Sequence, residues 1–81
     1  MITGTVTVRL KEGVLDPQGL TIQRALEHMG YEGLNAVRTG KTFEITLEAA
    51  DAATARARLQ EMSERLLANP VVETFAVEVQ A

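Results

Sequence analysis

The N-terminal run ITGTVTVRL, Ile2–Leu10, alternates between apolar and polar side chains, and this pattern constrains the fold more than any other feature. One side of the run carries Ile2, Val6, Val8 and Leu10. The other side carries Thr3, Thr5, Thr7 and Arg9. A period of two is typical of a β-strand with one buried face. The rest of the chain must therefore supply elements that cover that face.

A helix is predicted to begin at Asp16-Pro17. The Asp16 carboxylate can accept hydrogen bonds from backbone N–H groups of the first turn, and Pro17 suits the first helical position because it has no N–H to leave unpaired. The apolar stripe expected to face the core is Ile22, Ala25, Leu26 and Met29. Gly30 is placed to end the helix in a left-handed conformation.

A second, alanine-rich helix is predicted to begin after Asp51 as its cap. Its expected buried stripe is Ala55, Leu59, Met62 and Leu66. Glu61 and Arg65, four residues apart, are expected to pair on the solvent side. Asn69-Pro70 ends the helix, because proline disfavours the helical conformation for the residue before it.

Residues 34–48, LNAVRTGKTFEITLE, predict two strands around a tight turn at Thr39-Gly40-Lys41. Residues 71–79, VVETFAVEV, predict a last strand, and the pair Val71-Val72 indicates a bulge or an irregular entry. The resulting order, β-α-β-β-α-β, predicts an α+β fold: a ferredoxin-like sandwich with an antiparallel sheet and two helices on one face. We expect a single domain that spans residues 1–81.

Size and composition limit the function classes. A chain of 81 residues has a small core, and with no cysteine and one histidine it lacks the usual disulfide and metal supports, so we expect a homo-oligomer. A net charge of -3 argues against a nucleic-acid partner. No apolar run approaches the roughly 18 residues of a membrane span, and the N-terminus lacks signal-peptide features. We therefore expect no membrane association and a cytoplasmic location.

A search for catalytic groups gives little. Gly40-Lys41-Thr42 resembles the end of a phosphate-binding P-loop, but Asn35 stands where that motif has its first glycine, and a strand is predicted to follow. His28 has no second histidine or cysteine with which to form a metal site. We expect no catalytic, cofactor-binding or metal-binding residue in this chain.

Three blocks of the sequence, KEGVLDPQG (Lys11–Gly19), VRTGK (Val37–Lys41) and LANPVVE (Leu67–Glu73), together resemble the PurS family. The resemblance implies a small, non-catalytic subunit of phosphoribosylformylglycinamidine synthase, a ligase of purine biosynthesis that depends on ATP and glutamine. It implies that a homodimer or a dimer of dimers bridges a glutaminase subunit, which releases ammonia, and a synthetase subunit, which uses it. ATP, magnesium and glutamine are then expected in the complex and no cofactor in this chain.

The same blocks supply the candidates for contact with other subunits, which are Lys11, Glu12, Asp16, Pro17, Arg38, Lys41 and Asn69. The loop around Lys11 and Glu12 serves equally well as a docking loop or as a plain connection to the helix cap. Arg38 and Lys41 can form a small basic contact for an acidic partner, or remain isolated surface charges. The alternative function is a regulatory ferredoxin-like module that binds a small molecule.

Overall fold

The structure is a computed structural model that describes residues 1–80. Its elements are β1 (Ile2–Leu10), α1 (Pro17–His28), β2 (Gly40–Leu47), α2 (Ala52–Met62), the π-helical turn η1 (Ser63–Leu67) and β3 (Glu73–Gln80). The order β-α-β-α-β and the antiparallel sheet agree with the predicted ferredoxin-like α+β class. Residues 1–80 form three strands, however, where the sequence predicted four.

The strand order in the sheet is β2-β1-β3, with β1 antiparallel to both neighbours. Val6 lies between Phe43 of β2 and Val77 of β3. Because side chains alternate along a strand, Val6 shares its face with most apolar residues of the three strands, as the alternation predicted. Lys41 and Glu73, near the starts of β2 and β3, lie on the same face, and Ala76 lies on the other. The threonines of β1 lie on the opposite face.

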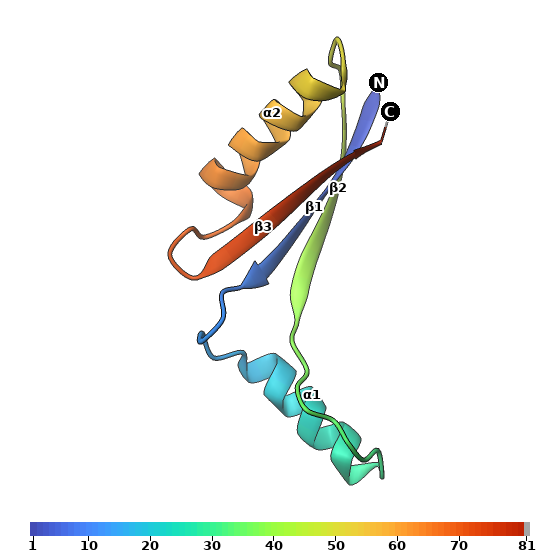
Figure 1. Ribbon diagram of the computed structural model, residues 1–81, viewed down its shortest axis with the longest axis vertical. Helices are drawn as coiled ribbons and strands as arrows, with labels where there is room; N and C mark the ends of the chain where they lie inside the picture. Colours follow the sequence, from blue (N-terminus) through green and yellow to red (C-terminus); the bar gives the residue numbers. More distant parts are fainter. Residues whose placement is uncertain (81) are drawn as a thin grey trace.

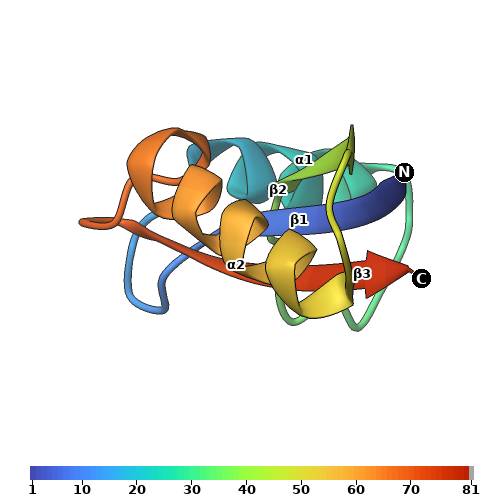
Figure 2. The same cartoon turned by 90° about the horizontal axis from the view of Figure 1, so that it is seen from above.

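Helix α2 covers the apolar face over β1 and β3 (Figures 1 and 2). Val6, Val8 and Leu59 are fully buried where helix and sheet meet. Gly4 permits the close approach, because a Cβ atom at that position would overlap Cδ1 of Leu59. The predicted cap is confirmed, since the Asp51 carboxylate accepts a hydrogen bond of 2.8 Å from the Thr54 N–H.

The predicted buried stripe of this helix is correct at its start and wrong at its end. Leu66 is 83% exposed and Met62 is 37% exposed. For Leu66 the turn η1 is the reason: the Ala68 N–H donates to the Ser63 carbonyl five residues earlier, which widens the turn by one residue. Ser63 and Ala68 take the buried positions instead.

Helix α1 has the predicted ends but not the predicted position. Asp16 caps it, Pro17 is its first residue, and Gly30 has a φ of 100° just beyond its end. The helix extends beyond the end of the sheet (Figure 1) and gives the molecule extents of 50 × 25 × 14 Å. The prediction that both helices cover one face is therefore wrong for α1. Ile22 and Met29 of its stripe are 38% and 71% exposed.

The predicted hairpin within residues 34–48 is also wrong in its first half. Residues 31–39 form no strand and run back along α1 towards the sheet (Figure 1). A hydrogen bond of 3.2 Å from Gln23 Nε2 to the Leu34 carbonyl ties this segment to the helix. Because α1 points away from the sheet, these residues are needed to return the chain, and Thr39-Gly40-Lys41 leads directly into β2 without a turn.

The entry into β3 is irregular, as predicted, but contains no bulge. Val71 and Val72 lie in a turn before the strand. The pairing of β3 with β1 then runs without interruption from Glu73 opposite Leu10 to Gln80 opposite Thr3. Phe75, Val77 and Val79 lie on the face that α2 covers, as predicted.

Candidate functional site at the junction of sheet and helix

The three sequence blocks that are separated along the chain meet where the sheet ends and α1 begins. We call this region the junction; it consists of residues 9–19, 37–41 and 67–73. Lys11 links its parts, because its backbone N–H donates to the Val72 carbonyl at 2.8 Å and its carbonyl accepts from Arg38 Nη2 at 3.4 Å. The junction thus contains all seven predicted contact residues.

Asp16 is the centre of the junction. One carboxylate oxygen accepts from the Gly19 N–H at 2.9 Å and the other from the Thr39 N–H at 2.6 Å. The Thr39 hydroxyl donates to both oxygens at 3.0 Å. These bonds, led by the two backbone N–H groups and assisted by the positive charge of Arg38, lower the pKa of Asp16 below its ordinary value.

The position of Asp16 bears on its predicted role as a contact residue. Asp16 is only 5% exposed, and its carboxylate joins the start of α1 to the chain that enters β2. Its effect on a partner would therefore be indirect, through the orientation of α1 and of the exposed residues beside it. Pro17, Lys11, Glu12 and Arg38 are all exposed.

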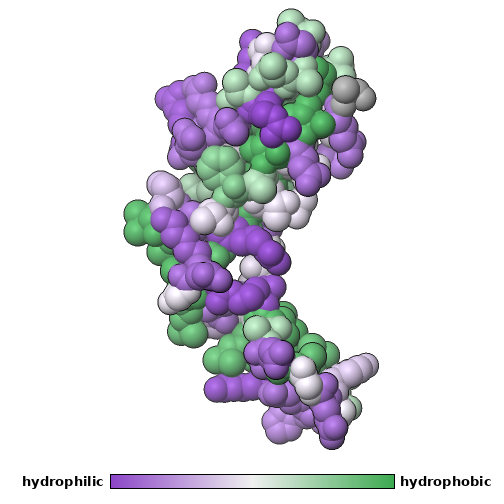
Figure 3. Space-filling view, viewed as in Figure 1, coloured by the Kyte–Doolittle hydropathy of each residue, from purple (hydrophilic) through white to green (hydrophobic). Residues whose placement is uncertain are grey.

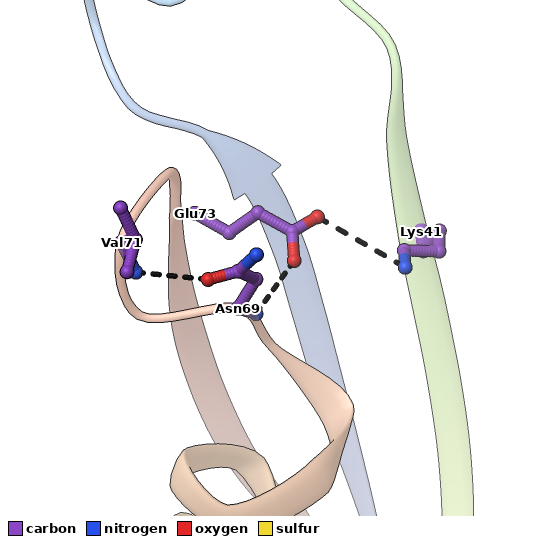
Figure 4. A network of polar contacts seen from close by, with 4 residues as sticks. All are labelled: Lys41, Asn69, Val71 and Glu73. Carbon is purple, nitrogen blue, oxygen red and sulfur yellow. Dashed lines mark hydrogen bonds and ion pairs between the residues drawn. The ribbon is translucent and has the colours of Figure 1, made fainter.

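A second polar group joins β2, β3 and the end of the helix, as Figure 4 shows. The Glu73 carboxylate accepts from the Asn69 N–H at 2.7 Å and lies 3.9 Å from Lys41 Nζ. The Asn69 side chain in turn accepts from the Val71 N–H at 3.0 Å. Asn69 and Glu73 thus fix the turn that leads into β3, while the Lys41 side chain remains 59% exposed.

The structure adds Arg9 and Glu73 to the residues that the sequence singled out. A pocket of about 610 Å³ opens between the sheet and α1, lined by Arg9, Leu10, Glu12, Gly13, Arg38 and Thr39. Figure 3 shows the surface hollowed in this region. Arg9 had been placed only on the polar face of the first strand, and nothing in the local pattern joins it to Arg38. Glu73 lay within the third block, but its pairing with Lys41 depends on the sheet register.

Other motifs do not form sites in the described part of the chain. Gly40-Lys41-Thr42 opens a strand, whereas a P-loop requires a helix at that point. His28 lies exposed at the end of α1. Among residues 1–80, no three side chains of His, Cys, Asp or Glu are grouped so that they could hold a metal ion. No helix within the same residues has the length and apolar character needed to cross a membrane.

The fold and the junction define a ferredoxin-like α+β protein with one helix uncovered and a polar surface built from three separate segments. Residues 3–81 match the family model of PurS, described as phosphoribosylformylglycinamidine (FGAM) synthase. The chain belongs to the PurS family. PurS proteins are subunits of phosphoribosylformylglycinamidine synthase, an enzyme of purine biosynthesis.

Two curated relatives show the extent of the likeness. The PurS subunit of Synechocystis sp. is 46% identical over 76 residues, which cover 94% of this chain and 76% of the relative. The PurS subunit of Methanocaldococcus jannaschii is 39% identical over 80 residues, which cover 99% of this chain and 96% of the relative.

Solved structures agree with the fold. The crystal structure of Methanocaldococcus jannaschii PurS, described as one of the subunits of formylglycinamide ribonucleotide amidotransferase, has a TM-score of 0.90 at 39% identity and covers 99% of this chain and 96% of that chain. A chain in the structure of PurLQS from Thermotoga maritima has a TM-score of 0.86 at 32% identity, with 99% of each chain covered.

Proposed function

We propose that this chain is the non-catalytic small subunit of an ATP- and glutamine-dependent phosphoribosylformylglycinamidine synthase. It bridges the glutaminase and synthetase subunits and supports the transfer of ammonia between them. The observation that carries the proposal is the family match over residues 3–81. The likeness over 99% of the chain to a chain from a PurLQS structure supports a role within an assembly.

A bridge assists the reaction by holding two active sites together. Joining two proteins through a third raises the effective concentration of each near the other, so released ammonia meets the synthetase before it diffuses away. In this proposal ATP, magnesium and glutamine act on the partner subunits, and the complex works in the cytoplasm.

The junction is the surface that we assign to the contact with a partner subunit. Lys11, Glu12 and Arg38 are exposed there, next to backbone that is fixed by Asp16 and by the Lys11 to Val72 hydrogen bond. Charged side chains select a complementary partner, and the rigid frame that carries them limits the backbone entropy lost on binding.

We also propose that the chain forms a homodimer or a dimer of dimers through α1. Within residues 1–80, neither the sheet nor the other helix covers the apolar side chains of this helix. Leu20 and Ile22 are 37% and 38% exposed, and Met29 is 71% exposed. On the sheet, Phe43, Ile45 and Leu47 of β2 are only partly buried, because α2 lies over the other two strands. A second copy can cover both apolar surfaces and supply the stability that a small core lacks.

The bridging proposal is tested by assembly of the three purified subunits, measured by analytical ultracentrifugation. The double variant Lys11→Ala/Glu12→Ala should weaken the ternary complex while leaving the Tm of the isolated chain nearly unchanged, because both residues are exposed. The matched control is Glu61→Ala/Arg65→Ala, which also removes one charge of each sign, from an exposed ion pair between α2 and η1 that lies outside the junction residues. Equal assembly of both variants and the wild type would contradict the assignment of the contact to the junction.

A further inference from the structure

We propose that the pocket at the junction binds the phosphate group of a small molecule between Arg9 and Arg38. The arginine pocket, as we call it, is lined by Arg9, Leu10, Glu12, Gly13, Arg38 and Thr39 and has a volume of about 610 Å³. Small-molecule sites occupy roughly 300–1,000 Å³, so the pocket has the size of a metabolite site. This binding goes beyond the bridging role. Glu12 and Arg38 belong to both surfaces, so the test uses the isolated chain, in which no partner subunit competes for them.

Neither arginine of the pocket is neutralised by an ion pair. Among residues 1–80, the ion pairs within 4.0 Å join Lys41 to Glu73 and Arg65 to Glu61. The only hydrogen bond that the Arg38 side chain makes in this part of the chain is the long one, 3.4 Å, to the Lys11 carbonyl. A guanidinium group carries five N–H donors in a planar fork, so most donors of both side chains are available to a ligand.

The Asp16 carboxylate lies near Arg38 but does not form an ion pair with it within 4.0 Å. Its two oxygens accept four hydrogen bonds from Gly19 and Thr39. It serves to fix the backbone at Thr39, which forms one wall of the arginine pocket. Asp16 therefore fixes the backbone next to Arg38 and leaves the Arg38 side chain without an ion pair among residues 1–80.

Two guanidinium groups on different segments suit a phosphate group better than a carboxylate. A phosphate monoester carries a charge of about -1.5 to -2 near pH 7 and three oxygens, so it can accept from two forks at once. A carboxylate carries one charge and is satisfied by a single fork. A long polyanion is disfavoured, because the chain has a net charge of -3 and Glu12 also lines the pocket.

The walls of the arginine pocket are held in place before any ligand binds. The Lys11 N–H donates to the Val72 carbonyl, and the Val14 N–H donates to the Lys11 carbonyl at 3.1 Å, which closes the turn around Gly13. The opposite wall is fixed by the Thr39 bonds to Asp16. Preorganised walls reduce the entropy lost on binding.

The test is a titration of the isolated full-length chain with inorganic phosphate and with ribose 5-phosphate, followed by amide NMR shifts at constant ionic strength. We expect saturable shifts at the amides of Gly13 and Thr39. Arg9→Gln and Arg38→Gln should each weaken binding about tenfold, the size of one charge-assisted hydrogen bond. Glu12→Gln should strengthen it, because it removes the opposing charge. Arg65→Gln, on the surface of η1, is the matched control and should leave binding unchanged.

Three results would overturn the inference. The first is the absence of saturable shifts with either phosphate compound, and the second is an equal loss of binding in Arg65→Gln. The third is acetate binding as tightly as phosphate, which would assign the pocket to a carboxylate of a partner protein. Arg38→Lys separates charge from geometry, since a lysine keeps the charge but not the fork, and it should weaken binding less than Arg38→Gln does. Because only the isolated chain is used, failure here leaves the bridging role intact.

Discussion

The two helices of this protein begin with the same kind of cap but differ in how much of their surface is buried. Each is capped by an aspartate, and their lengths are 12 and 11 residues. Helix α2 lies on the sheet and fully buries Ala55 and Leu59, whereas the only buried residue of α1 is Gly19. An amphipathic stripe thus predicts a helix and its apolar face, but not whether the chain's own sheet covers that face.

The two helices are also held by different forces. The position of α2 depends on apolar contacts with β1 and β3, so it is an outcome of hydrophobic burial. The position of α1 depends on hydrogen bonds: the buried Asp16 carboxylate accepts from Gly19 and Thr39, and Gln23 donates to the Leu34 carbonyl of the returning segment. We therefore expect changes at apolar residues of α2 to alter folding, and changes on α1 to alter its orientation and its partners.

The largest effect is expected at Leu59. The substitution Leu59→Ala removes a fully buried side chain and leaves a cavity between α2 and β1. It should lower the free energy of unfolding by about 3 kcal/mol, measured by urea denaturation. A loss under about 1 kcal/mol would contradict the view that α2 is held by its core contacts.

The next effect concerns association through α1. Ile22→Lys places a charge in the apolar stripe, and we expect it to weaken self-association about thirtyfold or more, which corresponds to about 2 kcal/mol. Sedimentation equilibrium measures the change, with the neighbouring exposed substitution Thr21→Lys as the control. If both variants associate as the wild type does, α1 is not the surface that joins the copies.

A smaller effect on stability is expected from Asp16→Asn. The amide keeps one acceptor oxygen but turns an NH2 group towards backbone N–H donors, so bonds to Gly19 or Thr39 are lost. We expect the Tm to fall by several degrees and amide exchange in the first turn of α1 to accelerate, with α2 unaffected. Equal acceleration in both helices would show that the carboxylate does not anchor α1 alone.

The pH dependence follows from the same carboxylate. Because hydrogen bonds lower the pKa of Asp16 below 3.8 in the folded state, its contribution is complete above 3.8 and is lost as the pH falls through the folded pKa. Asp51 has a lowered pKa for the same reason, through Thr54. Asp16→Asn should therefore lose less stability between pH 5 and 3 than the wild type, measured by thermal unfolding; an identical loss would contradict this cause.

The smallest effect is expected at Leu66. The π-helical turn leaves this side chain 83% exposed, so Leu66→Ala should change the free energy of unfolding by no more than about 0.5 kcal/mol. Leu59→Ala is the matched comparison, because a regular helix would place both residues on one face. A similar loss for the two would show that η1 is a regular α-helical turn in solution.

Features that depend on residues close together in the sequence were predicted correctly. The caps at Asp16 and Asp51, the left-handed Gly30 and the alternation in β1 and β3 all have local physical causes. The strand at residues 34–38 was predicted wrongly, because a turn signal such as Thr39-Gly40-Lys41 does not reveal whether a partner strand is within reach. The π-helical turn was missed because Leu66, seven residues after Leu59, fits a period of 3.6, whereas the buried Ala68 does not.

The site was predicted in its parts but not in its arrangement. The structure brings the three blocks together at the junction. The predicted contact residues in those blocks include Lys11, Asp16, Arg38, Lys41 and Asn69. Arg9 and Glu73 join them only through the sheet register, in which Arg9 lies opposite Gly40 and Glu73 lies opposite Leu10. No local pattern contains that information.

The most direct test of the bridging role is the rate of formylglycinamidine ribonucleotide formation by the glutaminase and synthetase subunits, with and without this chain. Each mixture receives either glutamine or free ammonia as the nitrogen source. The proposal predicts that the chain raises the rate with glutamine and leaves the rate with ammonia unchanged, because only the first requires two active sites to be held together. A glutamine-dependent rate that does not respond to the chain would contradict it.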